Sequence, residues 1–218
     1  IILATSCLGV SYFTFSKMFR VIGMGEDQID WIKVAKNWRV GINAFISQKT
    51  LFKTRPVIGF IHALVAWGFS LYLIVNLIDV LYGLIPHFKF LPNHVIGDVY
   101  RIFVDIFSVL VLFGVFYFLM RRFIQKDIRL QTEKPVMISD SALRGMKFDS
   151  LLVGTFIIVH VGSRFLSASF EIAGSHSDWS QPAANLVAKM WSGLEPGTIL
   201  VMEHITWWIA LGLILLFL

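Results

Sequence analysis

The feature that most limits the fold of this chain is its division into long apolar blocks. Most of the blocks run for about 20 residues or more, the length that an α-helix needs to cross the hydrocarbon core of a bilayer. The chain of 218 residues is 56% hydrophobic and only 15% charged, whereas a soluble domain carries about 25% charged residues. The pattern therefore predicts an all-α protein, a polytopic transmembrane bundle in contact with membrane lipid.

Five spans are predicted within a single membrane domain covering residues 1–218. They occupy about residues 1–22, 57–85, 99–120, 148–173 and 199–218. The sequence begins without Met and stops inside an apolar run. We therefore expect both ends to be cut and more chain to follow residue 218.

The charge of the connections predicts the orientation of the spans. Connections 23–55 and 121–147 hold most of the Lys and Arg residues outside the spans, whereas the opposite connections hold only Lys89 and Lys189. Basic loops stay in the cytoplasm. We therefore expect a bacterial cytoplasmic membrane protein with both basic loops inside, the N-terminus outside and the C-terminus cytoplasmic. The net charge of +5 is then a topology signal, and no nucleic-acid partner is expected.

Two connections contain patterns of short helices. In the first basic loop, apolar residues recur at helical spacing: Ile29, Ile32, Ala35, Trp38, Ile42 and Phe45. This predicts an amphipathic helix on the cytoplasmic side, lying either on the membrane surface or on a partner protein. In the last exterior loop, Ser180 and Pro182 are typical of a helix start, and Gly193 of an end after Trp191.

Three of the six histidines fall inside predicted spans: His62, His160 and His204. His87, His94 and His176 fall in exterior loops, where solvated side chains are expected. An ionisable ring in hydrocarbon is costly and by default indicates function. Neutral imidazole is the axial ligand of b-type haem, and histidines on facing helices can hold the iron from both sides. The pattern predicts haem b, one group with a second possible; hydrogen bonding between helices is the simpler alternative.

Depth in the membrane limits which histidines can share an iron. With a rise of about 1.5 Å per residue, His62 lies about 8 Å, His160 about 17 Å and His204 about 22 Å from the cytoplasmic face. His160 and His204 are then close enough in depth to pair. His62 and His204 differ by about 14 Å and should not share one iron.

Further residues fit a cofactor in the bundle. Arg164 lies one turn from His160 on the same face, where it can hold a haem propionate or pair with Glu171 or Glu203. Gly59 and Gly68 flank His62 and allow the close approach of a helix or of a flat macrocycle.

Polar residues near the span ends have weaker assignments. Lys53 and Arg55 lie where a quinone head group would approach from the cytoplasmic side. Asp79 and Asp105 are proton-path candidates, although a place near a span end or a bond to a neighbour is the more ordinary interpretation.

Two stretches resemble a known membrane domain. They are Arg55-Pro56-x-x-Gly59-x-x-His62 followed by Gly68-Phe69, and Glu203-His204-Ile205-Thr206-Trp207-Trp208. Both are similar to the N-terminal cytochrome b module of heterodisulfide-reductase-like iron–sulfur oxidoreductases. That group includes the electron-transfer-flavoprotein:menaquinone oxidoreductases and is similar in fold to the nitrate reductase gamma subunit. The resemblance extends over all five spans.

The resemblance implies b haem between the second and fifth spans, electron exchange with menaquinone, and a cytoplasmic iron–sulfur domain that usually follows. In the resembled family a histidine commonly lies two residues after the Trp pair, where this chain has Ala210. Either His160 and His204 replace the usual ligand pair, or the number of haems differs.

The expected function is a haem-carrying membrane subunit of a quinone-linked oxidoreductase, an electron-transfer component rather than a stand-alone enzyme. Electrons would pass between cytoplasmic iron–sulfur or flavoprotein partners and a quinone pool. With Cys7 the only cysteine, a Cys-ligated cluster within these residues is excluded. The alternative is a structural or pigment-binding subunit of a larger membrane complex without haem. A transporter is disfavoured because neither broken spans nor an inverted repeat is evident.

Overall fold

The computed structural model describes residues 2–25, 30–85, 94–127, 130 and 139–217. Within these residues the regular structure is helical, which confirms the all-α prediction. The helices are α1 (Ile2–Ile22), α2 (Trp31–Ser47), α3 (Lys49–Thr54), α4 (Pro56–Leu84), α5 (Val95–Leu119), the π-helix η1 (Met120–Ile124), α6 (Asp140–Gly174), α7 (Pro182–Ala188), the short 3₁₀ helix η3 (Lys189–Trp191) and α8 (Pro196–Phe217). The predicted exterior residue His87 lies outside the described residues.

Among the described residues, four helices are long and apolar enough to cross a membrane. They cover Pro56–Gly83, Val95–Ile124, Ser141–Gly174 and Pro196–Leu216, and they correspond to the second to fifth predicted spans. The first predicted span is helical as α1 but is not one of the four, so a fifth crossing stays a prediction. The four helices are compatible with a membrane protein, and the orientation of the spans stays a prediction as well.

Three of the spans begin earlier than predicted, because α5 starts at Val95, α6 at Asp140 and α8 at Pro196. The difference is largest for α6, where the charged residues Asp140, Arg144 and Lys147 interrupt the apolar pattern. The start of α6 has a capping signal of its own: the Ser139 hydroxyl accepts a hydrogen bond from the Ala142 amide at 3.3 Å. Such a cap gives an acceptor to one of the amide N–H groups of the first turn that have no partner within the helix.

The chain divides into two compact units, Ile1–Ala63 with Ile214–Leu218, and Leu64–Leu213. In the first unit, α2 begins where the Asp30 carboxylate accepts from the Lys33 amide at 3.0 Å. The helix lies where the first basic loop predicts one, and its place on a membrane surface stays a prediction. The α4 helix starts at Pro56, a residue whose missing N–H costs nothing in a first turn. Arg55 before it is not helical, with φ −148° and ψ 79°, in line with the exclusion of the helical conformation from a residue that precedes proline.

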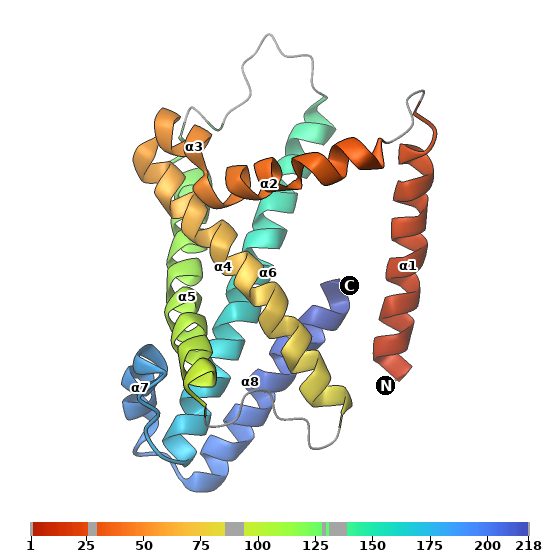
Figure 1. Ribbon diagram of the computed structural model, residues 1–218. Helices are drawn as coiled ribbons and strands as arrows, with labels where there is room; N and C mark the ends of the chain where they lie inside the picture. The colour runs from red at the N-terminus through yellow and green to blue at the C-terminus, as the bar shows by residue number, and fades with distance from the viewer. Residues whose placement is uncertain (1, 26–29, 86–93, 128–129, 131–138, 218) are drawn as a thin grey trace. The chain divides into compact units, whose positions relative to one another are not determined.

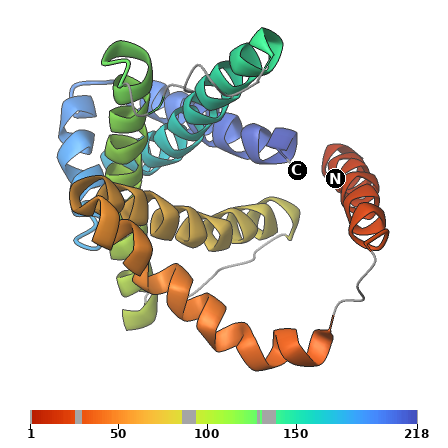
Figure 2. The ribbon, with the colours of Figure 1, turned by 90° about the horizontal axis from the view of Figure 1, so that it is seen from above.

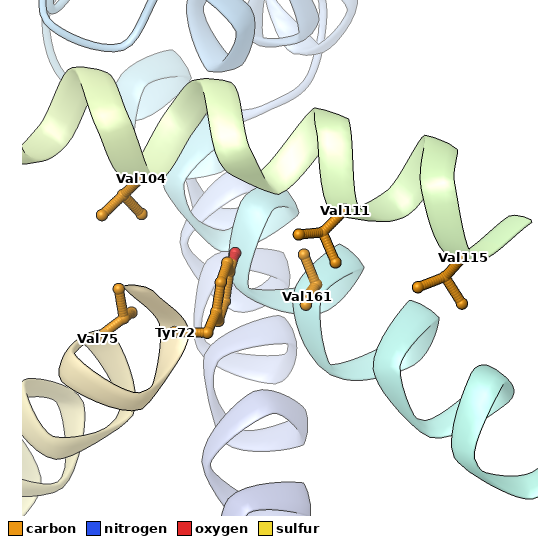
Figure 3. Close-up of a cluster of buried hydrophobic side chains, with 6 residues drawn as sticks. All are labelled: Tyr72, Val75, Val104, Val111, Val115 and Val161. Atoms are coloured by element: carbon orange, nitrogen blue, oxygen red, sulfur yellow. The ribbon is translucent and has the colours of Figure 1, made fainter. Parts of the chain in front are cut away.

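In the second unit, α5 packs against α6, and α7 contacts both (Figures 1 and 2). The buried core of the unit joins α4, α5 and α6: it contains Tyr72, Val75, Val104, Val111, Val115 and Val161. Figure 3 shows the three valines of α5 directed toward Tyr72, Val75 and Val161. Large apolar side chains such as Leu73 and Phe113 remain exposed, which suits contact with lipid.

The short helix α7 begins at Pro182, as the sequence predicts, and it is held by a carboxylate from another helix. Asp105 of α5 accepts hydrogen bonds from the backbone amides of Ala183 at 2.6 Å and Ala184 at 3.0 Å. Asp105 is buried, so the bonds to α7 satisfy a carboxylate that would otherwise be costly inside the bundle. Asp105 therefore has a structural partner, in line with the ordinary interpretation of this residue.

Candidate functional site

Of the two in-span histidines of the second unit, His160 and His204, His160 is the buried one. It is only 5% exposed. Its Nδ1 lies 3.1 Å from the carbonyl oxygen of Ala210 on α8, and its Nε2 lies 3.1 Å from Oδ1 of Asn76 on α4. A neutral imidazole has a single N–H, so it donates to one of these two oxygens. The ring thus connects three helices.

Aromatic rings fix the orientation of the His160 imidazole. Phe156, one turn earlier on α6, is stacked on it with the centroids 6.1 Å apart and an angle of 16° between the planes. Tyr72 of α4 meets it edge-on at 6.0 Å. The Tyr72 hydroxyl lies 2.7 Å from Ser108 Oγ, which donates to the Val104 carbonyl at 2.6 Å. A ring held in this way has its lone-pair direction set before any ligand arrives.

Arg164 forms an ion pair with Asp79 of α4. Its Nε lies 2.8 Å from Oδ2, and its Nη2 lies 3.4 Å from Oδ1. The expected pairing of Arg164 with Glu171 or Glu203 is therefore corrected to Asp79. Asp79 and Asn76 are three residues apart on α4, and His160 and Arg164 are four apart on α6, so each pair presents one face to the other helix.

His160 and His204 lie at different levels of the bundle. His160 is beside Ala210, six residues beyond His204, which is about 9 Å along a helix. Ser167 of α6 donates to the carbonyl of Glu203 at 3.4 Å, so the neighbour of His204 is level with a residue two turns beyond His160. The structure thus brings His160 to Ala210, and the agreement in depth with His204 expected from the sequence is not found.

His204 lies on an exposed face of α8. Its Nδ1 is 2.8 Å from the Leu200 carbonyl one turn earlier. When Nδ1 carries the proton, Nε2 keeps its lone pair for another group. The side chain lines an open apolar groove of about 570 Å³, together with Leu200, Val201, Ile205, Trp208 and Ile209.

The remaining sequence-based candidates belong to the first unit or to helix packing. His62, Lys53 and Arg55 are exposed in the first unit. A Cβ at Gly59 would lie 2.8 Å from the Leu51 carbonyl oxygen, so this glycine permits α3 to approach α4. A Cβ at Gly68 would overlap the Val111 side chain, so Gly68 permits α5 to approach α4. Of the two interpretations that the sequence leaves open for these glycines, the structure shows the close approach of helices.

A cavity of about 780 Å³, called the polar cavity below, lies at the end of the second unit remote from η1. Its lining comes from the last turns of α4, the first turns of α5, the second half of α6, the loop before α7, and α8. The charged members are Asp79, Asp98, Arg101, Arg164, Glu171, Asp178 and Glu203, and the aromatic members are Tyr82, Tyr100, Trp179 and Trp207.

Asp178, in the loop that covers the polar cavity, is held as a carboxylate. Burial alone would raise its pKa, but hydrogen bonds from Ser180 and Gln181 and the nearby Arg101 lower the pKa below its usual value. Ser180 Oγ donates to Oδ1 at 2.6 Å, and Arg101 Nε lies 3.2 Å from Oδ2. Arg101 also pairs with Asp98. The loop is thereby attached to α5 by charge.

Sequence reasoning missed two features of the site. It did not identify Asn76 as a neighbour of His160, and it did not predict that Asp79 pairs with Arg164. A signal was present: Tyr72, Asn76 and Asp79 are spaced by four and three residues in an otherwise apolar span, the spacing of one helix face. On α6, His160, Arg164, Ser167 and Glu171 follow the same spacing. Each of these two spans thus has one polar face in an otherwise apolar helix. Polar faces inside a membrane need polar partners, so the pattern predicts that the two faces lie against each other.

Two curated proteins are similar to this chain. It is 30% identical over 185 residues to a probable iron-sulfur-binding oxidoreductase FadF of Bacillus subtilis (strain 168), a match that covers 82% of this chain and 23% of the relative. It is 26% identical over 195 residues to an EtfAB:quinone oxidoreductase of Syntrophomonas wolfei subsp. wolfei, covering 85% of this chain and 25% of the relative. The chain thus spans about a quarter of the length of these relatives. No family model matches the chain, and no solved structure matches it.

Proposed function

We propose that this chain is a haem b-binding membrane domain of a quinone-linked oxidoreductase. It would pass electrons between a cytoplasmic iron–sulfur or flavoprotein partner and a quinone such as menaquinone. The observation that carries the proposal is His160, a buried imidazole oriented by contacts from three helices. The similarity to two oxidoreductases, one named for iron–sulfur binding and one for a quinone, supports the same class.

The donor set around His160 fits an axial ligand. A metal-bound histidine usually donates its other ring N–H to a carbonyl or carboxylate, which fixes the tautomer. Here the Ala210 carbonyl is placed to accept from Nδ1, which leaves the Nε2 lone pair for iron. When bound, haem b supplies one-electron transfer.

The other histidines are proposed as further ligands. His204 also has Nδ1 close to a backbone carbonyl, that of Leu200 on its own helix, and its exposed ring lines an apolar groove that could accept a macrocycle face. His62 is the third proposed ligand. Arg164 and the two glycines, Gly59 and Gly68, are weaker candidates: Asp79 already engages Arg164, and a propionate would share that guanidinium. Lys53 and Arg55 stay the sequence-based candidates for a quinone contact.

Optical spectroscopy tests the proposal. We expect the full-length protein, purified in detergent, to show a Soret band that shifts on reduction and a pyridine haemochrome of the b type. His160→Ala should lower the haem content by half or more, and His204→Ala and His62→Ala report on the remaining ligands. His176→Ala, in an exposed loop, is the control and should leave the spectrum unchanged.

The opposite result favours the alternative function. Protein that is folded, judged by circular dichroism and a single gel-filtration peak, but has no Soret band contradicts haem binding. A structural or pigment-binding subunit would then be the better interpretation, and extraction of the pigments followed by mass spectrometry separates those two.

A further inference from the structure

The polar cavity has the size and position of a small-molecule site that opens within the membrane-spanning helices. Ligand pockets commonly measure about 300–1,000 Å³, and this one measures about 780 Å³. Four of its walls belong to helices that are long and apolar enough to cross a membrane, α4, α5, α6 and α8. A ligand reaching it from the bilayer is therefore lipophilic in part.

The lining combines flat aromatic surfaces with hydrogen-bonding groups of both kinds. Tyr82, Tyr100 and Trp207 supply rings. Arg164 supplies a donor: Asp79 engages its Nε and Nη2, and the guanidinium has a third nitrogen, Nη1. Glu171 and Glu203 supply acceptors. A planar ring with polar oxygens at opposite edges matches this lining.

The charges of the cavity are organised in a way that does not suit a metal ion. Three of its five carboxylates are in ion pairs with arginine, Asp79 with Arg164, and Asp98 and Asp178 with Arg101. Within the described part of the chain, no group of three or more His, Cys, Asp or Glu side chains is placed to hold a metal. The two glutamates, Glu171 from α6 and Glu203 from α8, are therefore better suited to accept hydrogen bonds from an organic hydroxyl.

The cavity is also close to the imidazole on which the proposed function depends. Arg164 lines the cavity and follows His160 by four residues on α6, about 6 Å along the helix axis. Asp79 lines the cavity and follows Asn76, the other neighbour of His160, by three residues. A molecule in the cavity thus lies about one helical turn from the level of His160.

We propose that the polar cavity binds a quinone head group. Glu171 and Glu203 accept hydrogen bonds from the hydroxyl groups of its quinol form, and Arg164 donates to a ring oxygen. The lipophilic tail of the molecule passes between the helices into the bilayer. This assignment rests on the proposed function and places the quinone at a different position from Lys53 and Arg55.

Photoaffinity labelling locates the site. The full-length protein in liposomes is irradiated with an azido-naphthoquinone bearing a prenyl tail, with and without excess unlabelled menaquinone, and digested for mass spectrometry. We expect label that menaquinone displaces on the peptides containing residues 78–82, 97–104, 164–171, 177–181 or 203–207, which line the cavity. Displaceable label confined to other peptides, such as one containing Lys53 and Arg55, overturns the cavity assignment while the quinone function stands. Absence of displaceable label on any peptide overturns both.

A pair of matched variants tests the role of the carboxylates. Charge-assisted hydrogen bonds are about twice as strong as neutral ones, so we expect the Glu171→Gln/Glu203→Gln double variant to bind reduced menadione about tenfold more weakly. Affinity is read from quenching of tryptophan fluorescence under anaerobic conditions. Glu195→Gln removes an exposed carboxylate outside the cavity and should bind like the wild type. Equal affinity of the double variant and the wild type contradicts the role given to the two glutamates.

Discussion

Arg164 and Asp79 bring opposite charges into the interior of the second unit. Their side chains are 24% and 10% exposed, with Nε and Oδ2 2.8 Å apart. Removing one partner of such a pair leaves an uncompensated charge, which costs about 3–5 kcal/mol, whereas replacing both can be nearly neutral. We therefore expect Asp79→Asn to lower the thermal unfolding temperature in detergent strongly, and Asp79→Asn/Arg164→Gln to recover part of the loss.

A matched control for this pair is Arg122→Gln. Arg122 donates from an exposed position to the Met146 carbonyl at 3.2 Å, so its loss should change the unfolding free energy by less than about 0.5 kcal/mol. If the double variant were as unstable as the sum of its single variants, the two charges would not stabilise each other.

Asp178 predicts a dependence of stability on pH. Its folded-state pKa is lowered despite burial, chiefly by Ser180, Gln181 and Arg101. A lowered pKa contributes stability that is complete above the unfolded-state pKa of about 3.9 and is lost as the pH falls through the folded-state value. We expect Asp178→Asn to be less stable than the wild type at pH 6. The difference in melting temperature should shrink as the pH is lowered toward 3; a difference independent of pH would contradict this role of the carboxylate.

At the scale of helices, the contact between α4 and α5 depends on a residue without a side chain. A Cβ at Gly68 would overlap Val111 and would lie 3.2 Å from Phe107. Overpacking of this kind costs about 1–3 kcal/mol, so Gly68→Ala should lower the stability measured by thermal unfolding. Gly212→Ala, on α8 with open space around it, should be neutral or slightly stabilising. Val111→Ala added to Gly68→Ala should restore much of the loss if the overlap is the cause.

The sequence predicts helices far better than it predicts which side chains meet. Length and apolar character locate α4, α5, α6 and α8, and Pro182 locates the start of α7, because these signals are local. The partners of His160 were not predictable from depth, since a few residues of error in a span boundary shift a side chain by several ångström. The hydrogen bond between His160 and Ala210 could not be predicted for another reason. Its acceptor is a backbone carbonyl, which every residue has, so the residue type gives no signal.

At the scale of the whole molecule, the basic connections predict an orientation for the spans. The loop before α7 should lie outside the cell, and the basic connection after η1 should lie in the cytoplasm. Ser177 in the loop before α7 and Lys126 after η1 are both exposed. In a Cys7→Ser background, we expect a membrane-impermeant maleimide added to intact cells to modify the S177C variant, and to modify the K126C variant only after the cells are opened. Equal modification of both variants in intact cells would contradict the predicted orientation.

The Tyr72 hydroxyl has a consequence for how the bundle can move. Ser108 gives its proton to the Val104 carbonyl, so Tyr72 is the donor in its bond to Ser108. If α4 moved along α5 by one turn, about 5.4 Å, the Tyr72 hydroxyl would lose its acceptor, Ser108. A buried donor without an acceptor costs about 1–3 kcal/mol. Sliding of α4 along α5 is thus opposed by this hydrogen bond. Tilting of the two helices about the contact between Tyr72 and Ser108 keeps the bond and is the less costly movement.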